Sequence, residues 1–133
     1  MNFIDLEMQQ KLIKNDLDAA IEKVLLHGKY IQGPEVFELE SELQKYTDAK
    51  YCITVANGTD ALLISQLALG IGAHDEVIMP SFNYISAAET AGVLGAKQVF
   101  VDVCKETFNI DTNLIENAIT EKTKLIIATS LFG

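Results

Sequence analysis

The chain has 133 residues, of which 19 are acidic and 10 are basic, so its formal net charge at pH 7 is −9. This acidic balance argues against nucleic acid as a partner, because phosphate backbones attract basic surfaces. A hydrophobic content of 49% excludes an intrinsically disordered chain, and the length is sufficient for one domain with a core. No apolar run is long enough to cross a membrane and the start lacks the features of a signal peptide, so we expect a cytoplasmic protein.

The cysteine and arginine content narrows the kinds of site that the chain can form. Cys52 and Cys104 are isolated residues in predicted strands, and we interpret them as buried thiols. The sequence has no CxxC motif and no Cys/His cluster, so we expect no metal site. All ten basic residues are lysines, so an anion site in this chain must use backbone N–H groups, hydroxyls or lysine.

The first fifty residues are predicted to form a helical amino-terminal segment. Leu17 and Ile21 belong to an apolar set at helical spacing, which predicts an amphipathic helix over about residues 16–27. A loop is expected over Lys29–Gly33, and Pro34 suits the first turn of a second helix. The glutamates of that second helix are interpreted as a solvated face.

From residue 51 onward the pattern changes to alternating strands and helices. Strands are expected at residues 51–56, 76–79, 98–103 and 124–129, and helices at about 60–69, 85–94 and 112–120. Short apolar strands separated by helices are typical of a parallel sheet covered by helices. We therefore predict an α/β fold with three layers, α/β/α, and a mostly parallel sheet over residues 51–133. Because no helix follows the last predicted strand, we expect this domain to be incomplete.

The turn Asn57-Gly58-Thr59 is the first candidate site, because it joins a β-branched run to the start of a helix. A glycine there lets a ligand approach the backbone, and the start of a helix presents free N–H groups and a positive dipole end. Such a turn predicts a phosphate site or, equally well, only a tight turn with a helix cap. It is neither a Walker A loop nor a dinucleotide fingerprint.

Other polar and aromatic residues are weaker candidates. Phe82 is expected to pack under its loop, whereas Tyr84 either packs or offers a flat face to a planar ligand. Asp102 could hold a ribose or a protonated ring nitrogen, but we favour a cap for the next turn. His27 and His74 have no nucleophilic partner at recognisable spacing, and we expect both at the surface.

Seven segments, taken in order, carry a likeness to one protein family. They are Gly28–Val36, Ala56–Leu62, Gly72–Pro80, Ser81–Tyr84, Leu94–Lys97, Phe100–Val103 and Thr107–Asp111. Together they resemble the amino-terminal part of DegT/DnrJ-type nucleotide-sugar aminotransferases, which are pyridoxal phosphate (PLP) enzymes of the aspartate-aminotransferase fold. The likeness covers nearly the whole chain. It implies the large domain of a fold type I PLP transferase, with residues 51–133 as its first part.

This resemblance implies roles for five residues. Gly58 and Thr59 would hold the PLP phosphate, and Tyr84 would stack on the pyridine ring. Tyr30 and Ile31, in the loop after the first helix, would lie near the substrate. These roles follow from the family's motifs and not from the spacing of the residues alone.

The resemblance also says what this stretch of chain lacks. In the family, the Schiff-base lysine, the aspartate that partners the ring nitrogen and the small domain all follow the position of Gly133, so Asp102 is not that aspartate. None of the ten lysines falls in the family's lysine motif. Transamination uses that lysine both as anchor and as base, so we expect no catalytic residue and no turnover in this chain alone.

The family's reaction gives the expected function. The full enzyme would be a homodimer that transfers an amino group, from glutamate, to the keto carbon of a UDP- or dTDP-linked sugar. The chain most resembles enzymes that aminate a UDP-N-acetyl-3-keto-hexuronic acid for surface-polysaccharide or O-antigen lipopolysaccharide synthesis. Two alternatives stay open: a non-catalytic module that binds a phosphorylated ligand or assembles with a partner, and a truncated gene product with no separate role.

Overall fold

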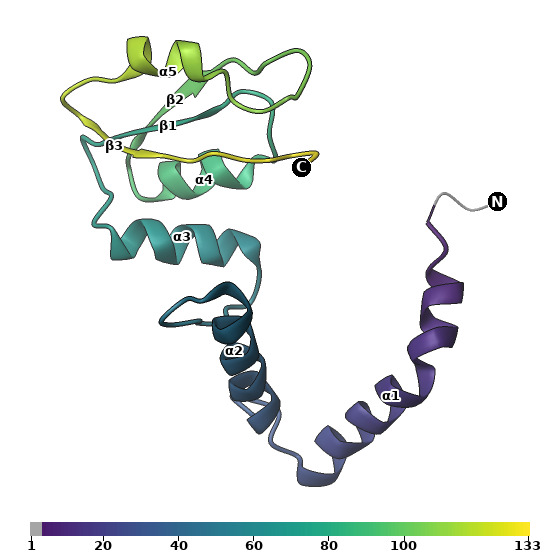
Figure 1. Cartoon of the computed structure of the whole chain (residues 1–133). Coiled ribbons are helices and arrows are strands. Elements are labelled where there is room, and N and C mark those ends of the chain that lie inside the picture. The colour runs from purple at the N-terminus through teal and green to yellow at the C-terminus, as the bar shows by residue number, and fades with distance from the viewer. Residues whose placement is uncertain (1–3) are drawn as a thin grey trace. The chain divides into compact units, whose positions relative to one another are not determined.

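The computed structural model describes residues 4–133, which form two compact units that divide after Thr54 (Figure 1). The first unit consists of two helices, α1 (Leu6–His27) and α2 (Pro34–Thr47). The second contains a three-stranded sheet and three further helices. Among the described residues, no helix is both long enough and apolar enough to cross a membrane.

Helix α1 begins about ten residues earlier than predicted. The Asp5 side chain caps it by accepting a hydrogen bond from the Met8 N–H group at 3.0 Å. Lys11 and Glu7, one turn apart, form an ion pair of 2.6 Å on its exposed face. The extra turns therefore rest on capping and on good helix-forming residues, whereas the prediction used only apolar spacing. Helix α2 begins at Pro34, as predicted.

The strand predicted over residues 51–56 is wrong, because this stretch has no strand in the structure. The N–H and hydroxyl groups of Thr54 both donate to the Glu40 carboxylate of α2, each at 2.8 Å. Ile53 is 79% exposed. β-Branched residues favour extended backbone, but a strand also needs a neighbouring strand, which the described part of the chain does not supply here. Glu40 is thus a structural acceptor and not part of a solvated face.

The sheet of the second unit is parallel throughout. Its strands are β1 (Glu76–Pro80), β2 (Lys97–Val101) and β3 (Thr123–Ile126), in the spatial order β2-β1-β3. Ile78 at the centre of β1 is paired with Val99 on one side and with Ile126 on the other. The helices that connect these strands are α4 (Ser86–Val93) and α5 (Thr112–Ala118), while α3 (Gly58–Ala68) precedes the sheet.

Helices cover both faces of the sheet, so the predicted three-layer α/β/α arrangement is confirmed. On one face, Val77 and Met79 pack with the alanines of α4. On the other, Ile78 and Val101 pack with Ile110 and with the apolar side of α5. Figure 1 shows α4 and α5 on opposite sides of the sheet, with α3 beyond α4. All five residues of β1 are buried, as expected for a central parallel strand.

Glycines end two of these helices, as predicted. Gly70 has φ +73° after α3, and Gly95 has φ +80° after α4. At the first of them, the Gly70 N–H donates to the Leu67 carbonyl and the Ile71 N–H donates to the Gln66 carbonyl, both at 3.0 Å. This pair of bonds is a Schellman cap, which requires a left-handed residue and therefore favours glycine.

Candidate functional site

The candidate site lies at one edge of the second unit. Because the sheet is parallel, the carboxyl ends of its strands face the same way, and the amino-terminal ends of α3 and α4 lie at that same side (Figure 1). Ligands of open parallel sheets bind beyond the carboxyl ends of the strands. Gly58, Thr59 and Tyr84 all belong to segments at this edge.

The first turn of α3 supplies donors for an anion. Asn57 caps the helix: its Oδ1 atom accepts from the Asp60 N–H at 2.9 Å, and its carbonyl accepts from the Ala61 N–H at 3.1 Å. Within residues 4–133, the N–H groups of Gly58 and Thr59 and the Thr59 hydroxyl donate to no other group. Three donors therefore remain at the positive end of an eleven-residue helix.

Gly58 fits a ligand-facing role better than a structural one. Its backbone is helical, and a Cβ atom at this position would meet no described atom within 4 Å. The protein itself thus gives no steric reason for a glycine. The Asp60 carboxylate in the same turn opposes an anion, but it accepts a 3.2 Å hydrogen bond from the Asn57 amide. Donors, dipole and open space together fit a phosphate group.

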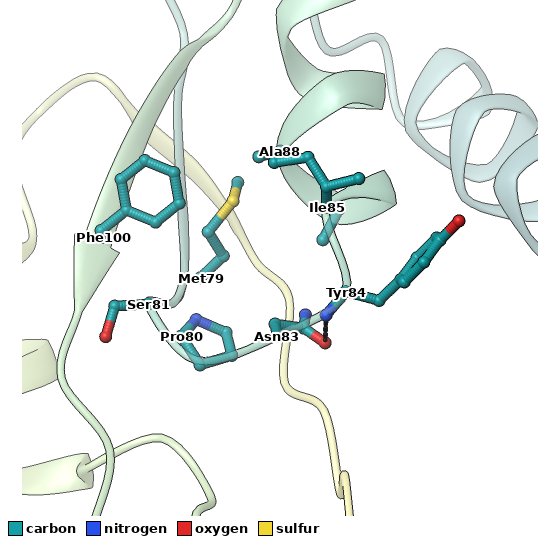
Figure 2. A pocket seen from close by; sticks show the side chains of 9 residues that line it. Met79, Pro80, Ser81, Asn83, Tyr84, Ile85, Ala88 and Phe100 are labelled. Atoms are coloured by element: carbon teal, nitrogen blue, oxygen red, sulfur yellow. Dashed lines mark hydrogen bonds between the residues drawn. The ribbon is translucent and has the colours of Figure 1, made fainter.

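Tyr84 lies in the loop that leaves β1, and this residue is 71% exposed. The hollow beside it has a volume of only about 40 Å³ and lies among Met79, Phe100 and the start of α4. That volume holds water but not an aromatic ring. In Figure 2 the Tyr84 side chain points away from Met79 and Phe100. Its open faces are therefore available to a planar ligand outside this hollow.

Phe82 is 49% exposed and so does not pack under its loop, contrary to the prediction, although its ring contacts another aromatic ring. Its ring centroid is 5.6 Å from that of Phe108, which in turn lies 5.5 Å from that of Phe132. The cap predicted for Asp102 is not confirmed, because within residues 4–133 its side chain bonds only to the next residue. Its carboxylate accepts from the Val103 N–H at 2.8 Å.

The side chain of His27 is 23% exposed, so this predicted surface residue is half-buried. Its Nδ1 atom accepts from the Lys29 N–H at 2.9 Å, so the proton of a neutral ring is on Nε2, which lies 3.2 Å from both carboxylate oxygens of Glu35. The pKa of Glu35 is lowered, first by its own backbone N–H and then by His27 and Lys23. Sequence reasoning missed this contact, since nothing local marks a pair eight residues apart across a turn.

Tyr30 and Ile31 lie in the turn between α1 and α2, within the first unit, and both are exposed. His74 is exposed and has φ +80°, in the loop before β1. Two residues that the sequence did not reveal also belong to the site edge. Asn83 and Thr129 are joined by a side-chain hydrogen bond of 2.9 Å across 46 positions.

This fold and this edge match those of known proteins. The model of the DegT/DnrJ/EryC1/StrS aminotransferase family matches residues 11–133, nearly the whole chain. The chain belongs to this family. The predicted resemblance is thereby confirmed, and the chain contains part of the family's α/β fold.

Relatives of this chain are much longer. Over its full length the chain is 56% identical to the UDP-2-acetamido-2-deoxy-3-oxo-D-glucuronate aminotransferase of Pseudomonas aeruginosa and spans 37% of it. A DegT DnrJ EryC1 StrS aminotransferase from Brucella abortus has 42% identity and a TM-score of 0.95, with all of this chain and 38% of that one covered. S. venezuelae DesV, crystallised with a ketimine intermediate, has 36% identity and a TM-score of 0.93, with 99% and 36% covered. The chain thus spans little more than a third of each.

Proposed function

We propose that this chain is the cofactor-phosphate part of a PLP-dependent nucleotide-sugar aminotransferase. The observation that carries the proposal is the first turn of α3, where Gly58 and Thr59 leave N–H and hydroxyl donors unpaired within the described chain and a Cβ on Gly58 would meet open space. Membership of an aminotransferase family supports the phosphate of PLP as the ligand of this turn. When bound, PLP supplies the electron sink for amino transfer.

The residues of this chain would bind and orient the cofactor. The N–H groups of Gly58 and Thr59, with the Thr59 hydroxyl, would hold the phosphate by charge-assisted hydrogen bonds. The Tyr84 ring would lie against the pyridine ring and fix its plane. Tyr30 and Ile31 would contact the sugar substrate. Lys97, at the start of β2, donates to Glu76 at 2.8 Å, so this lysine is committed to a structural contact at the opposite edge of the sheet.

The acceptor sugar, the amino donor and the working form can also be proposed. We propose a UDP-linked 2-acetamido-3-keto-hexuronic acid as the acceptor, glutamate as the amino donor and a cytoplasmic homodimer as the working form. The 56% identity to the Pseudomonas aeruginosa enzyme that is named for this sugar supports the choice. A dTDP-linked keto sugar is the competing acceptor. The product would enter surface-polysaccharide synthesis, including O-antigen lipopolysaccharide.

The test is amino transfer by the product of the complete gene, measured as 2-oxoglutarate formed from glutamate with each keto sugar. We expect turnover with the UDP-linked 3-keto-hexuronate and at least tenfold less with a dTDP-linked 3-keto sugar. We expect no turnover from the 133-residue chain alone, because the family's Schiff-base lysine is not among its lysines. A complete product that binds phosphate but transfers no amino group to any keto sugar would favour the non-catalytic binding module.

A further inference from the structure

The loop that carries Tyr84 is tied to both neighbouring strands. On one flank, the Ser81 N–H donates to the carbonyl of Val101, the last residue of β2, at 2.8 Å. On the other flank, Asn83 Nδ2 donates to Thr129 Oγ1 at 2.9 Å, just beyond the end of β3. The first tie uses main chain and tolerates most substitutions, whereas the second depends on two particular side chains.

The amide of Asn83 is held at both ends. Its Oδ1 atom accepts the N–H of Tyr84 at 2.7 Å, a bond drawn in Figure 2. Its Nδ2 atom must therefore be the group that faces Thr129, because a flipped amide would place a donor against the Tyr84 N–H. Asn83 thus connects the backbone of Tyr84 directly to the segment after β3.

The ring of Tyr84 has little else to fix it. The residue is 71% exposed, and within residues 4–133 its ring has neither an aromatic partner nor a side-chain hydrogen bond. Its neighbour Phe82 is different, since that ring packs against Phe108. The direction of the Tyr84 side chain is therefore set by the backbone at residues 83–84, and the hydrogen bonds of Asn83 hold that backbone in place.

We propose that Asn83, anchored by Thr129, is a positioning residue that sets the Tyr84 ring for the pyridine ring of the cofactor. This inference rests on the proposed function, because it assigns the planar ligand of Tyr84 to PLP. It concerns the ring and not the phosphate, whose donors belong to α3. A defect in this anchor should therefore weaken binding of the ring and leave binding of the phosphate unchanged.

The first test needs no cofactor. Thr129→Val removes the acceptor hydroxyl with little change in shape, and Thr129→Ser keeps it. Amide hydrogen exchange of Tyr84 is measured by NMR in the 133-residue chain, with the Ile78 amide at the centre of the sheet as the reference for global stability. We expect Tyr84 exchange to be about fivefold faster in Thr129→Val, as for loss of one hydrogen bond, and restored in Thr129→Ser. Equal exchange in the two variants would overturn the inference.

The second test separates ring from phosphate. Pyridoxamine 5′-phosphate, which has no aldehyde to react with lysines, and inorganic phosphate are titrated separately into the chain. We expect Thr129→Val to weaken pyridoxamine 5′-phosphate binding about fivefold and to leave the phosphate affinity unchanged, with Thr129→Ser as wild type. Equal weakening of both ligands, or of neither, would overturn the positioning role. If the wild-type chain binds pyridoxamine 5′-phosphate no better than phosphate, the proposed function fails, whatever the exchange result.

Discussion

Gly33 offers the sharpest perturbation of the turn that carries Tyr30 and Ile31. It precedes α2, and a Cβ atom added to it would lie 2.3 Å from the backbone carbonyl oxygen of Lys29. Ordinary contacts between such atoms begin at about 3.4 Å, so Gly33→Ala forces a backbone displacement of about 1 Å. A backbone carbonyl cannot swing aside as a flexible side chain would. We therefore expect this substitution to open the turn.

The expected destabilisation of the closed turn follows from the cost of overpacking, which is typically about 1–3 kcal/mol. If that cost falls on the closed turn, the open population rises roughly 5- to 150-fold. Trypsin cleavage after Lys29 measures this open population. Lys29 lies inside the turn and its N–H donates to His27, so the protease needs the turn to open before it can cleave there. The initial rate of cleavage after Lys29 is measured by mass spectrometry, relative to cleavage after the exposed Lys105 of the second unit.

A matched control is available in Gly72→Ala, since a Cβ there would meet no described atom within 4 Å. This variant should leave both cleavage rates within twofold of wild type. If Gly33→Ala also leaves cleavage after Lys29 within twofold, the turn is not held by the close approach of these two backbones, and the reasoning is refuted.

Two further predictions concern the second unit. Ile78→Ala, at a fully buried position in the central strand, should lower the free energy of unfolding in urea by about 2–5 kcal/mol, and Ile126→Ala, at a half-exposed position in β3, by clearly less; equal losses would contradict the assigned core. The pKa of Glu76 is lowered, first by a hydrogen bond from Lys97 and then by one from Thr120. The Glu76 carboxylate therefore stabilises the fold at pH values above the ordinary glutamate pKa of about 4.3. This stabilisation is lost as the pH falls through the lowered pKa. Glu76→Gln should therefore reduce the loss of urea stability between neutral and strongly acidic pH, and an unchanged pH dependence would contradict this role.

Local signals in the sequence predicted much of the fold. Pro34 marked the start of α2, while Gly70 and Gly95 marked helix ends, because each residue type restricts or permits particular backbone angles. The strand expected at residues 51–56 failed for the opposite reason. Its composition describes one chain segment, but a strand depends on a partner far away in the sequence, and the described chain pairs Thr54 with Glu40 instead.

The site divides in the same way. Gly58 and Thr59 could be proposed as site residues because a turn between a β-branched run and a helix is a local pattern, and Tyr84 because a family motif contains it. The bond from Asn83 to Thr129 could not be found, since it joins positions 46 residues apart that only the sheet brings together. Such contacts carry no periodicity or composition that a single sequence displays.

The phosphate site at the first turn of α3 is tested most directly by NMR titration of the 133-residue chain with pyridoxamine 5′-phosphate. We expect saturable shifts of the Gly58 and Thr59 amides, and we expect no such shifts with pyridoxamine, which lacks the phosphate. These shifts should be lost in Gly58→Val, in which the added Cβ atom meets no described protein atom within 4 Å, while the Ile78 amide should keep its wild-type position as evidence of an intact sheet. Amides that do not move at saturation, or that move equally in Gly58→Val, would contradict the proposed phosphate site.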